Sequence, residues 1–354
     1  EIFTYAGQEF NLNSPKQLSE ILFDVLELPQ IKKRSTAVGV LEKLEDKHPI
    51  IAPVLEYRKY QKLYSTYASG LTKYIADDGK IHTTFNQHAT QTGRLSSSDP
   101  NLQNISVRDP ETREIRRAFL ASEGAYLVSL DYSQIELRVL AFLAKEAKMI
   151  EAFKNHEDIH ERTAREIFHQ EAIDGSMRRQ AKSVNFGIVY GMSPYGLSKQ
   201  LDIPMGQASD FIKRYHAAYP NIEVYMNTLI DQCKETGYVT TYFNRRRYIP
   251  EIHSSNHGTR SFGERAAMNA PIQGTAADII KLAMVKVQNH LNDQGYRSKM
   301  LLQVHDELVF NMYEDEMEQL IPEIKIIMEE IVQWPVPLEV SVTVGRNWLE
   351  DIYA

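Results

Sequence analysis

Apolar residues spaced three and four apart predict helices along the first seventy residues. The spacing is clear in SPKQLSEILFDVLEL at 14–28, and Asn13 or Ser14 followed by a proline is typical of a helix start. A second helical pattern covers residues 36–67, where Pro53 predicts a break. The N-terminal part of the chain is therefore expected to be helical.

Other apolar runs predict strands. AYLVSL at 125–130 has the length of a buried strand, and SKMLLQVHDELVFNMY at 298–313 holds two apolar runs around a tight turn. A weaker candidate with β-branched residues lies at 81–85, after a turn at Gly79. Between these candidates, residues 91–108 are polar and irregular. Such a long irregular segment is either a plain surface loop or a functional one.

The pattern from 145 to 237 is mainly helical, with helix starts expected at Asp158 and Ser176. Within it, two cations and two aromatic residues recur every four positions and form one stripe on a helix: Arg178, Lys182, Phe186 and Tyr190. The cations suit a polyphosphate, and the rings suit a sugar or base beside it. A lone R-x-x-x-K is more often a solvated basic face, so the polyphosphate interpretation depends on the other segments.

Residues 238–250 predict a strand pair that turns at Asn244-Arg245. Two further helices are expected at 261–268 and 275–291, because Pro271 between them interrupts an ideal helix. Three polar residues in this region again lie four apart: Arg265, Asn269 and Gln273. Ordinary helix-surface polarity explains them equally well.

The charge and cysteine content narrow the class of protein. At 354 residues the chain is long enough for two or more lobes, and its formal net charge of −7 argues against a uniformly basic nucleic-acid coat. This net charge does not exclude a local basic cleft. One cysteine, Cys233, excludes an internal disulfide and a cysteine-only metal cluster, which fits a reducing compartment. No apolar run reaches the length of a membrane span. The chain does not begin with Met, so a fragment or processed chain is expected.

Two aspartates stand where apolar strands end or turn. Asp131 follows the strand at 125–130, and Asp306 lies in the turn of the later pair. If the strands share a sheet, the two carboxylates meet at one edge and suit Mg²⁺, which takes the rest of its ligands from water and substrate phosphates. Ser133 and Glu136 also match a capping box, so Glu136 is either a helix cap or part of the site. The residues alone indicate a metal-dependent phosphoryl or nucleotidyl transferase; the P-loop and zinc-deaminase motifs are both missing.

Several motifs together resemble the polymerase region of family A DNA polymerases, in order and over nearly the whole chain. DYSQIELR at 131–138 and QVHDELV at 303–309 are similar to the family's two metal motifs, and RRQAKSVNFGIVYG at 178–191 is similar to its nucleotide-binding helix. TGRLSSSDPNLQNI and ERAAMNAPIQGTAADII match two further family segments.

The resemblance implies an α+β, right-hand polymerase fold with an antiparallel palm sheet, helical fingers and a partial thumb. It implies the end of the thumb and entry to the palm at 1–70, palm at 71–144, mainly fingers at 145–260, and palm again at 261–354. It also implies that an N-terminal part of the same polypeptide, with an exonuclease-like domain and the rest of the thumb, precedes this chain.

The resemblance further implies template-directed addition of deoxynucleotides to a primer 3′-hydroxyl, in replication and in repair by gap filling and RNA-primer replacement. The implied partners are primer–template DNA and dNTPs, with no membrane, in the bacterial cytoplasm near the nucleoid. The implied cofactor is a pair of Mg²⁺ ions, for which Mn²⁺ can substitute.

Residue roles follow from the same resemblance. Asp131, Asp306 and the Tyr132 carbonyl are expected to bind metal, and Lys182 to assist catalysis. The expected dNTP-binding residues are Gln134, Glu136, His160, Arg178, Lys182, Phe186 and Tyr190, with Glu136 excluding ribonucleotides. The expected DNA-binding residues are Arg94, Arg265, Asn269, Gln273 and His305, with Glu307 in support.

Two positions depart from the family pattern: Ser106 replaces a usual Pro, and Asn244 replaces a common Gly. Phe186, in place of Tyr, implies discrimination against dideoxynucleotides. A single-subunit RNA polymerase, which also uses two metal-binding aspartates, is a second interpretation, but Glu136 and Phe186 disfavour it. A catalytically silent DNA-binding protein is a third interpretation, disfavoured because Asp131, Asp306 and Lys182 are all present.

Overall fold

A computed structural model describes residues 1–105 and 110–352 of the chain. Position 106, where the sequence departs from the family pattern, lies outside the described residues. The chain divides into two compact units, Glu1–Thr83 and Thr84–Ala354. In the described ranges no helix is both long enough and apolar enough to cross a membrane.

The first unit is helical, as its periodicity predicts. Ser14 caps helix α2 by accepting a hydrogen bond from the Gln17 amide, and Pro15 occupies the first helical position. Pro53 lies in the first turn of α4, where a backbone N–H has no partner within the helix, so the proline costs no hydrogen bond. The break in the helical pattern therefore comes before Pro53 and not at it. Leu22, Leu44 and similar side chains form a separate small core. The elements are α1 (Ile2–Ala6), α2 (Pro15–Glu20), α3 (Val38–Leu41) and α4 (Ile51–Lys62), with short 3₁₀ or π-helical turns at Ile21–Val25, Glu42–Leu44, Leu63–Ala68 and Leu71–Tyr74.

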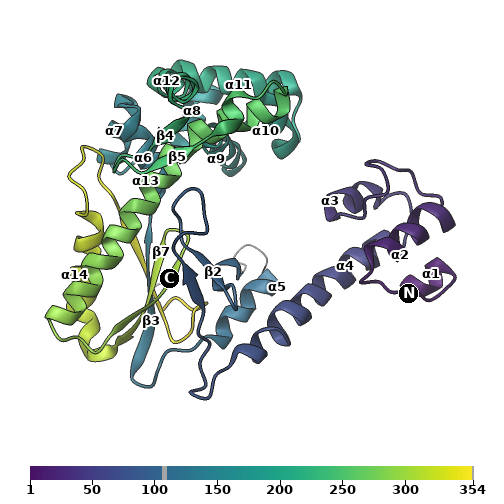
Figure 1. The fold of residues 1–354 in the computed structure, drawn as a ribbon, viewed down its shortest axis with the longest axis horizontal. Helices are drawn as coiled ribbons and strands as arrows, with labels where there is room; N and C mark the ends of the chain where they lie inside the picture. The colour runs from purple at the N-terminus through teal and green to yellow at the C-terminus, as the bar shows by residue number, and fades with distance from the viewer. Residues whose placement is uncertain (106–109, 353–354) are drawn as a thin grey trace. The chain divides into compact units, whose positions relative to one another are not determined.

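A four-stranded antiparallel sheet, in the order β6-β7-β3-β8, forms the centre of the second unit (Figure 1). Its strands are β3 (Ala125–Tyr132), β6 (Lys299–Val304), β7 (Glu307–Tyr313) and β8 (Val340–Gly345). The predicted strand and hairpin are thus confirmed, and they share one sheet. Strand β8 was not predicted, although VSVTVG has a strand-like β-branched content.

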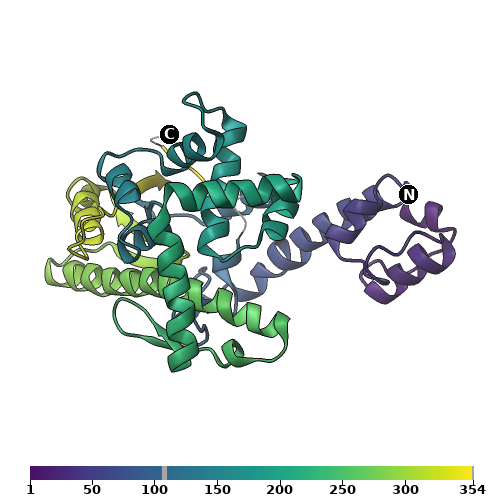
Figure 2. The same ribbon diagram turned by 90° about the horizontal axis from the view of Figure 1, so that it is seen from above.

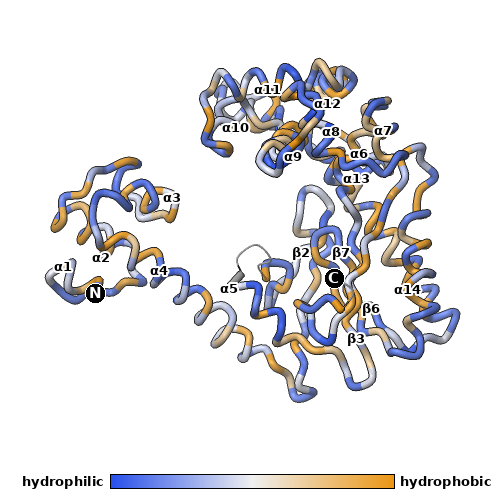
Figure 3. The backbone as a smooth tube through the Cα atoms, turned by 180° about the vertical axis from the view of Figure 1, so that it is seen from behind, coloured by the Kyte–Doolittle hydropathy of each residue, from blue (hydrophilic) through white to orange (hydrophobic). Residues whose placement is uncertain are grey.

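Helices cover this sheet and continue beyond one of its ends. Figures 1 and 2 show α13 and α14 side by side along the sheet, with α8 to α12 gathered beyond the end where α6 begins. The helices are α5 (Pro110–Arg113), α6 (Ile135–Leu143), α7 (Ala147–Lys154), α8 (Ile159–Phe168), α9 (Gly175–Val189), α10 (Pro194–Leu201), α11 (Met205–Ala218), α12 (Pro220–Thr236), α13 (His257–Asp293) and α14 (Glu314–Glu329), with 3₁₀ turns at Leu102–Asn104, Glu114–Ala118 and Pro250–His253. The sheet strands carry hydrophobic colours in Figure 3.

One continuous core joins the sheet to these helices. Leu130 and Phe310 from the sheet, Ile188 from α9 and Leu320 from α14 belong to the same buried cluster. Full burial of each such side chain stabilises the fold by roughly 1.5–3 kcal/mol before its entropic cost is counted. The core therefore fixes α6 and α9 against the edge of the sheet where the aspartates lie.

Helix α13 corrects one expectation. The sequence predicted two helices separated near Pro271, but α13 is one helix of 37 residues that contains this proline. The proline removes one intrahelical hydrogen bond. Residues before it, such as Ala267, pack in one buried cluster, and residues after it, such as Ile272 and Ile279, pack in the main core. Packing on both sides outweighs the local cost.

Two short hairpins complete the unit. β1 (Thr84–Asn86) pairs with β2 (Ser96–Ser98), so part of the polar segment 91–108 is ordered as a strand. β4 (Tyr238–Thr240) pairs with β5 (Arg246–Tyr248) as predicted, and Asn244 in the turn has a φ of 63°, a value that asparagine tolerates better than most residues.

Candidate active site

Asp131 and Asp306 lie at the same edge of the sheet. Asp131 pairs in register with Glu307 across β3 and β7, and the Tyr132 amide donates a 3.1 Å hydrogen bond to the Asp306 carbonyl. Asp131 is open to solvent on one side, but protein atoms crowd its carboxylate. This partial desolvation, with the charges of Asp306 and Glu307, raises the pKa of Asp131 to about 7. The edge therefore gathers negative charge.

The carboxylate of Asp306 tests whether this end of the sheet suits a cation. Burial raises its pKa, against the opposing charges of Arg94 and His305. Its Oδ1 atom is buried and has no hydrogen-bond partner in the described structure. A buried carboxylate oxygen left unpaired is costly, and a cation would satisfy it. The two aspartates thus fit a hard divalent ion.

The ligand set is sparse. In residues 1–105 and 110–352 no group of three or more His, Cys, Asp or Glu side chains is arranged to hold a metal. One or two carboxylates completed by water and substrate phosphates is the usual environment of Mg²⁺, whereas dedicated protein cages suit other metals. The Tyr132 hydroxyl donates to the Met328 carbonyl at 2.7 Å and anchors the end of β3.

Glu136 is held by two partners far away in sequence. Its side chain is 5% exposed, forms an ion pair with Arg94, and accepts a 3.1 Å hydrogen bond from the Tyr190 hydroxyl. Burial raises the pKa of Glu136, while the Arg94 charge opposes the shift. Burial, together with the Glu136 carboxylate, raises the pKa of Tyr190 to about 12.

Of the two alternatives for Glu136, the capping box does not form. Helix α6 begins at Ile135, and its N-cap is Gln134, with a φ of 55° and no side-chain capping bond. The Ser133 amide, which a capping box would pair with Glu136, donates to the Glu339 carbonyl at 2.8 Å instead. Arg94 and Tyr190 draw Glu136 away from the helix start, because a charged partner is a stronger attraction than a helix amide.

The stripe on α9 forms as predicted, with Tyr190 at the C-cap. Its start was misassigned: Asp174, not Ser176, caps the helix by accepting from the Ser176 and Met177 amides. Arg178 pairs with Asp158 at 2.6 Å, and Asp158 also caps α8 as predicted. Lys182 is exposed. The rings of Phe186 and Tyr190 lie nearly parallel, with centroids 6.5 Å apart.

The polar residues of α13 lie beside the C-terminal end of α9. The Asn269 amide donates to the Val189 carbonyl at 3.4 Å, and Gln273 interacts with the Tyr190 hydroxyl. Arg265 lies next to Gly191. These three residues therefore adjoin the stripe.

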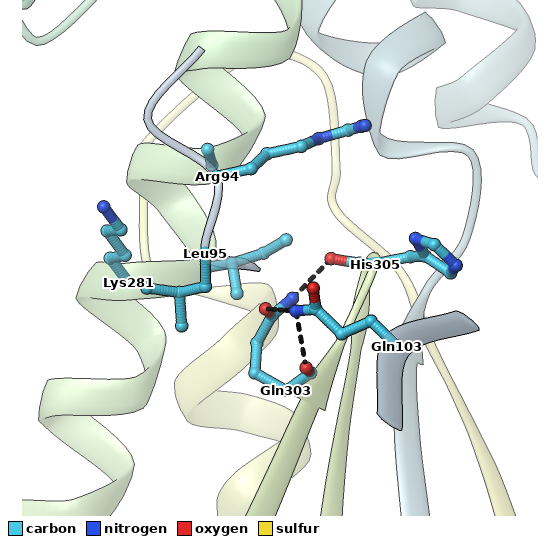
Figure 4. A pocket seen from close by; sticks show the side chains of 8 residues that line it. Arg94, Leu95, Gln103, Lys281, Gln303 and His305 are labelled. Carbon is cyan, nitrogen blue, oxygen red and sulfur yellow. Dashed lines mark hydrogen bonds between the residues drawn. The ribbon is translucent and has the colours of Figure 1, made fainter. Parts of the chain in front are cut away.

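A pocket lined by residues such as Arg94, Gln303 and His305 was only partly predicted from the sequence. Figure 4 shows the Gln103 and Gln303 amides pointing toward one another, with Arg94 and His305 nearby. Gln103 donates to the Gln303 carbonyl at 3.0 Å, and Gln303 donates to the His305 carbonyl. The two glutamines were not singled out in the sequence, although Gln303 is a polar residue within an apolar strand.

The remaining candidates lie at the edges of the site. His305 is exposed with a φ of 53°, in the turn beside Asp306. Glu307 accepts a long 3.5 Å hydrogen bond from the Trp348 indole. His160 is buried beside α9 rather than at the sheet.

Comparison with known proteins shows the family. The model of DNA polymerase family A matches residues 1–350. The chain is 51% identical to DNA polymerase I of Geobacillus stearothermophilus and 49% identical to the thermostable DNA polymerase I of Thermus aquaticus, in each case over 99% of this chain. It spans about two fifths of the length of these relatives, 41% and 43% respectively.

A solved structure agrees in fold. The POL domain of Pol1 from M. smegmatis, in complex with DNA primer-template and dNTP, superposes with a TM-score of 0.93 at 43% identity, covering 99% of this chain and 63% of that one. The predicted polymerase fold with its antiparallel sheet is therefore confirmed. The carboxylate pair, the basic and aromatic stripe and these similarities lead to one conclusion: the chain belongs to DNA polymerase family A.

Proposed function

We propose that this chain is a DNA-directed DNA polymerase that adds deoxynucleotides to a primer 3′-hydroxyl on a template. The observation that carries the proposal is the pair Asp131 and Asp306, with the unpartnered Oδ1 of Asp306, beside a helix that presents Arg178 and Lys182. The Tyr190 hydroxyl of that helix donates a hydrogen bond to Glu136. This hydrogen bond links the C-terminal end of the stripe to α6, which begins at Ile135, shortly after Asp131. Besides burial, the negative charge of Asp306 helps to raise the pKa of Glu136.

Asp131, Asp306 and the Tyr132 carbonyl would hold two Mg²⁺ ions, for which Mn²⁺ can substitute. Bound ions would activate the attacking oxygen and stabilise the leaving one. The raised pKa of Asp131 and the burial of Asp306 support a bound cation, since both carboxylates resist ionisation without one.

The helical stripe would hold the nucleotide. Arg178 and Lys182 suit the triphosphate, and Lys182 would donate a proton to the departing pyrophosphate. In the reaction the primer 3′-hydroxyl would lose its proton to water and its oxygen would bond to the α-phosphorus, while the bond from that phosphorus to pyrophosphate breaks. Phe186 would pack on the deoxyribose. Gln134 at the start of α6 would lie near the triphosphate.

Glu136 would act as a gate against ribonucleotides. Arg94 and Tyr190 hold its carboxylate in one place, which a 2′-hydroxyl group would crowd. The single-subunit RNA polymerase interpretation is disfavoured for that reason.

Residues around the pocket, together with the polar residues of α13 beside α9, would contact the DNA near the primer terminus. The set combines cationic and amide side chains that suit the duplex backbone and minor groove: Arg94, Gln103, Arg265, Asn269, Gln273, Gln303 and His305, with Glu307 in support. The M. smegmatis relative holds a primer-template and a dNTP, which supports this assignment.

We also propose the division into the end of the thumb and entry to the palm (1–70), palm (71–144 and 261–354) and mainly fingers (145–260). The part of the relatives that this chain does not span supports an N-terminal remainder of the same polypeptide. A role in gap filling and RNA-primer replacement, in the bacterial cytoplasm near the nucleoid, completes the proposal.

Primer extension tests the proposal. We expect the chain with Mg²⁺ to extend a primed template with dNTPs, and Asp306→Ala to abolish extension. Asp315→Ala is the matched control, because Asp315 is an exposed carboxylate in the first turn of α14. Equal use of NTPs would contradict the gate assigned to Glu136. If the chain binds DNA but does not extend the primer, and a version lengthened at the N-terminus does not extend it either, the catalytically silent DNA-binding protein would be favoured.

A further inference from the structure

Four buried polar side chains form a hydrogen-bonded chain between α8, α9 and the start of α12. Tyr219, Thr163 and Asn185 are fully buried and His160 is 2% exposed. The Tyr219 hydroxyl lies 3.3 Å from Thr163 Oγ1, Thr163 Oγ1 lies 3.2 Å from Asn185 Oδ1, and Asn185 Nδ2 lies 3.0 Å from His160 Nδ1. Sequence reasoning singled out only the histidine.

The chemistry of each group fixes which atom donates and which accepts along these four hydrogen-bonded side chains. An amide nitrogen can only donate, so His160 Nδ1 must accept from Asn185. The Asn185 carbonyl can only accept, so Thr163 donates its single proton there, and Tyr219 must donate to Thr163. With Nδ1 as acceptor, a neutral imidazole carries its proton on Nε2.

His160 stays neutral and adjoins the stripe. Burial, with Lys182 and Arg178 in support and Asp158 opposing, lowers the pKa of His160 to about 4. Its ring centroid lies 5.8 Å from that of Phe186. In the described part of the chain no protein atom accepts a hydrogen bond from Nε2.

We propose that Asn185 is a positioning residue: it holds His160 in the Nε2–H tautomer, so that the neutral ring presents a hydrogen-bond donor to the nucleotide triphosphate. Thr163 and Tyr219 orient the Asn185 amide. The inference rests on the proposed function for its ligand, but the tautomer is a property of the free protein.

The arrangement has a physical advantage. In the other tautomer Nε2 would present a lone pair, which repels phosphate oxygens. Arg178 and Lys182 already supply charge, and a third cation in a buried position would carry a large desolvation cost. A neutral donor of fixed direction adds a contact without that cost.

The first test uses the metal-free, nucleotide-free protein. Nitrogen-15 NMR of the His160 ring, assigned with His160→Gln, is expected to show a neutral Nε2–H tautomer at pH 7. Thr163→Val removes the proton that orients the amide, and Asn185→Leu removes the donor, so both are expected to give mixed tautomers. Thr163→Ser keeps the hydroxyl and is expected to retain the original signal. An Nδ1–H tautomer in the parent protein would overturn the inference. So would an Nε2–H signal that is unchanged in both Thr163→Val and Asn185→Leu.

The second test is a double-mutant cycle on nucleotide binding. A dideoxy-terminated primer–template and the matching dNTP measure affinity without chemistry. We expect Asn185→Leu to weaken dNTP binding about tenfold, the effect of losing one hydrogen bond to a charged group. In a His160→Gln background the same change is expected to have no effect. An equal loss in both backgrounds would show a merely structural role, which also overturns the inference. Absence of dNTP binding in the parent would instead count against the proposed function, and the NMR result would still stand.

Discussion

The Tyr190 hydroxyl donates a 3.1 Å hydrogen bond to Oε2 of Glu136, joining the end of α9 to the first turn of α6. Arg94 holds the other oxygen of this carboxylate. Because both partners act on a buried group, the position of Glu136 depends on the placement of α9. A movement of α9 would therefore remove one of the two partners that hold the Glu136 carboxylate.

Removal of the Glu136 side chain is expected to admit ribonucleotides. Glu136→Ala should reduce the dNTP-to-NTP ratio of kcat/KM by about 10²-fold, the typical limit for sterically rejecting one added hydroxyl. Glu136→Gln keeps the bulk and should keep most of the discrimination. Tyr190→Phe should have a smaller effect, since Arg94 still holds the carboxylate. Single-nucleotide incorporation kinetics measure the ratio; an unchanged ratio in Glu136→Ala would refute the gate.

The carboxylate edge should make the metal-free protein less stable as pH rises. The pKa of Asp131 is raised to about 7 from 3.8, so the folded state binds more protons than the unfolded state between about pH 4 and 7. Stability is then lost as pH increases through that window. Asp131→Asn should therefore raise Tm in EDTA at pH 8 but not at pH 4.

Added Mg²⁺ should reverse this effect. A bound ion stabilises the parent by mass action and should do so less in Asp131→Asn. Thermal melts with and without Mg²⁺ measure both differences. A Tm gain for Asp131→Asn that is the same at pH 4 and pH 8 would argue against the electrostatic explanation.

Gly274 is expected to tolerate no side chain, although it lies in a helix. A Cβ there would approach Thr241 Cγ2 to 2.5 Å and the Thr92 carbonyl to 3.3 Å. Overpacking should cost about 1–3 kcal/mol, against a gain of about 1 kcal/mol in helix propensity, so Gly274→Ala should destabilise the protein by up to about 2 kcal/mol. Gly206→Ala in α11 is the control, because a Cβ at that position would have no neighbouring atom within 4 Å. Urea unfolding should show opposite signs for the two changes.

Phe186 should confer discrimination against dideoxynucleotides. Phe186→Tyr adds a hydroxyl beside the sugar, which can replace the interaction lost with the 3′-hydroxyl. The dNTP-to-ddNTP preference should therefore fall in this variant, as measured by competition on a primed template. Equal incorporation of both substrates by the parent would contradict the prediction.

Local patterns predicted the parts of this site that depend on short-range geometry. Strand β3, the hairpin around Asp306 and the spacing of Arg178 and Lys182 on α9 all follow from periodicity and turn chemistry, which act over a few residues. The similarity of the motifs to a known family then predicted the fold. The roles of individual residues stay predictions.

Tertiary structure decided what depends on distant partners. Ser133 and Glu136 fit a capping box locally, but Arg94, 42 residues away, and Tyr190, 54 residues away, hold the carboxylate elsewhere. Pro271 predicted a break that packing on both sides overrides. Asn185 carries no signal in the sequence, because its meaning comes from a hydrogen bond to His160 on another helix. The chain alone specifies which groups are present and how each segment folds; which groups meet depends on the free energy of packing the whole core.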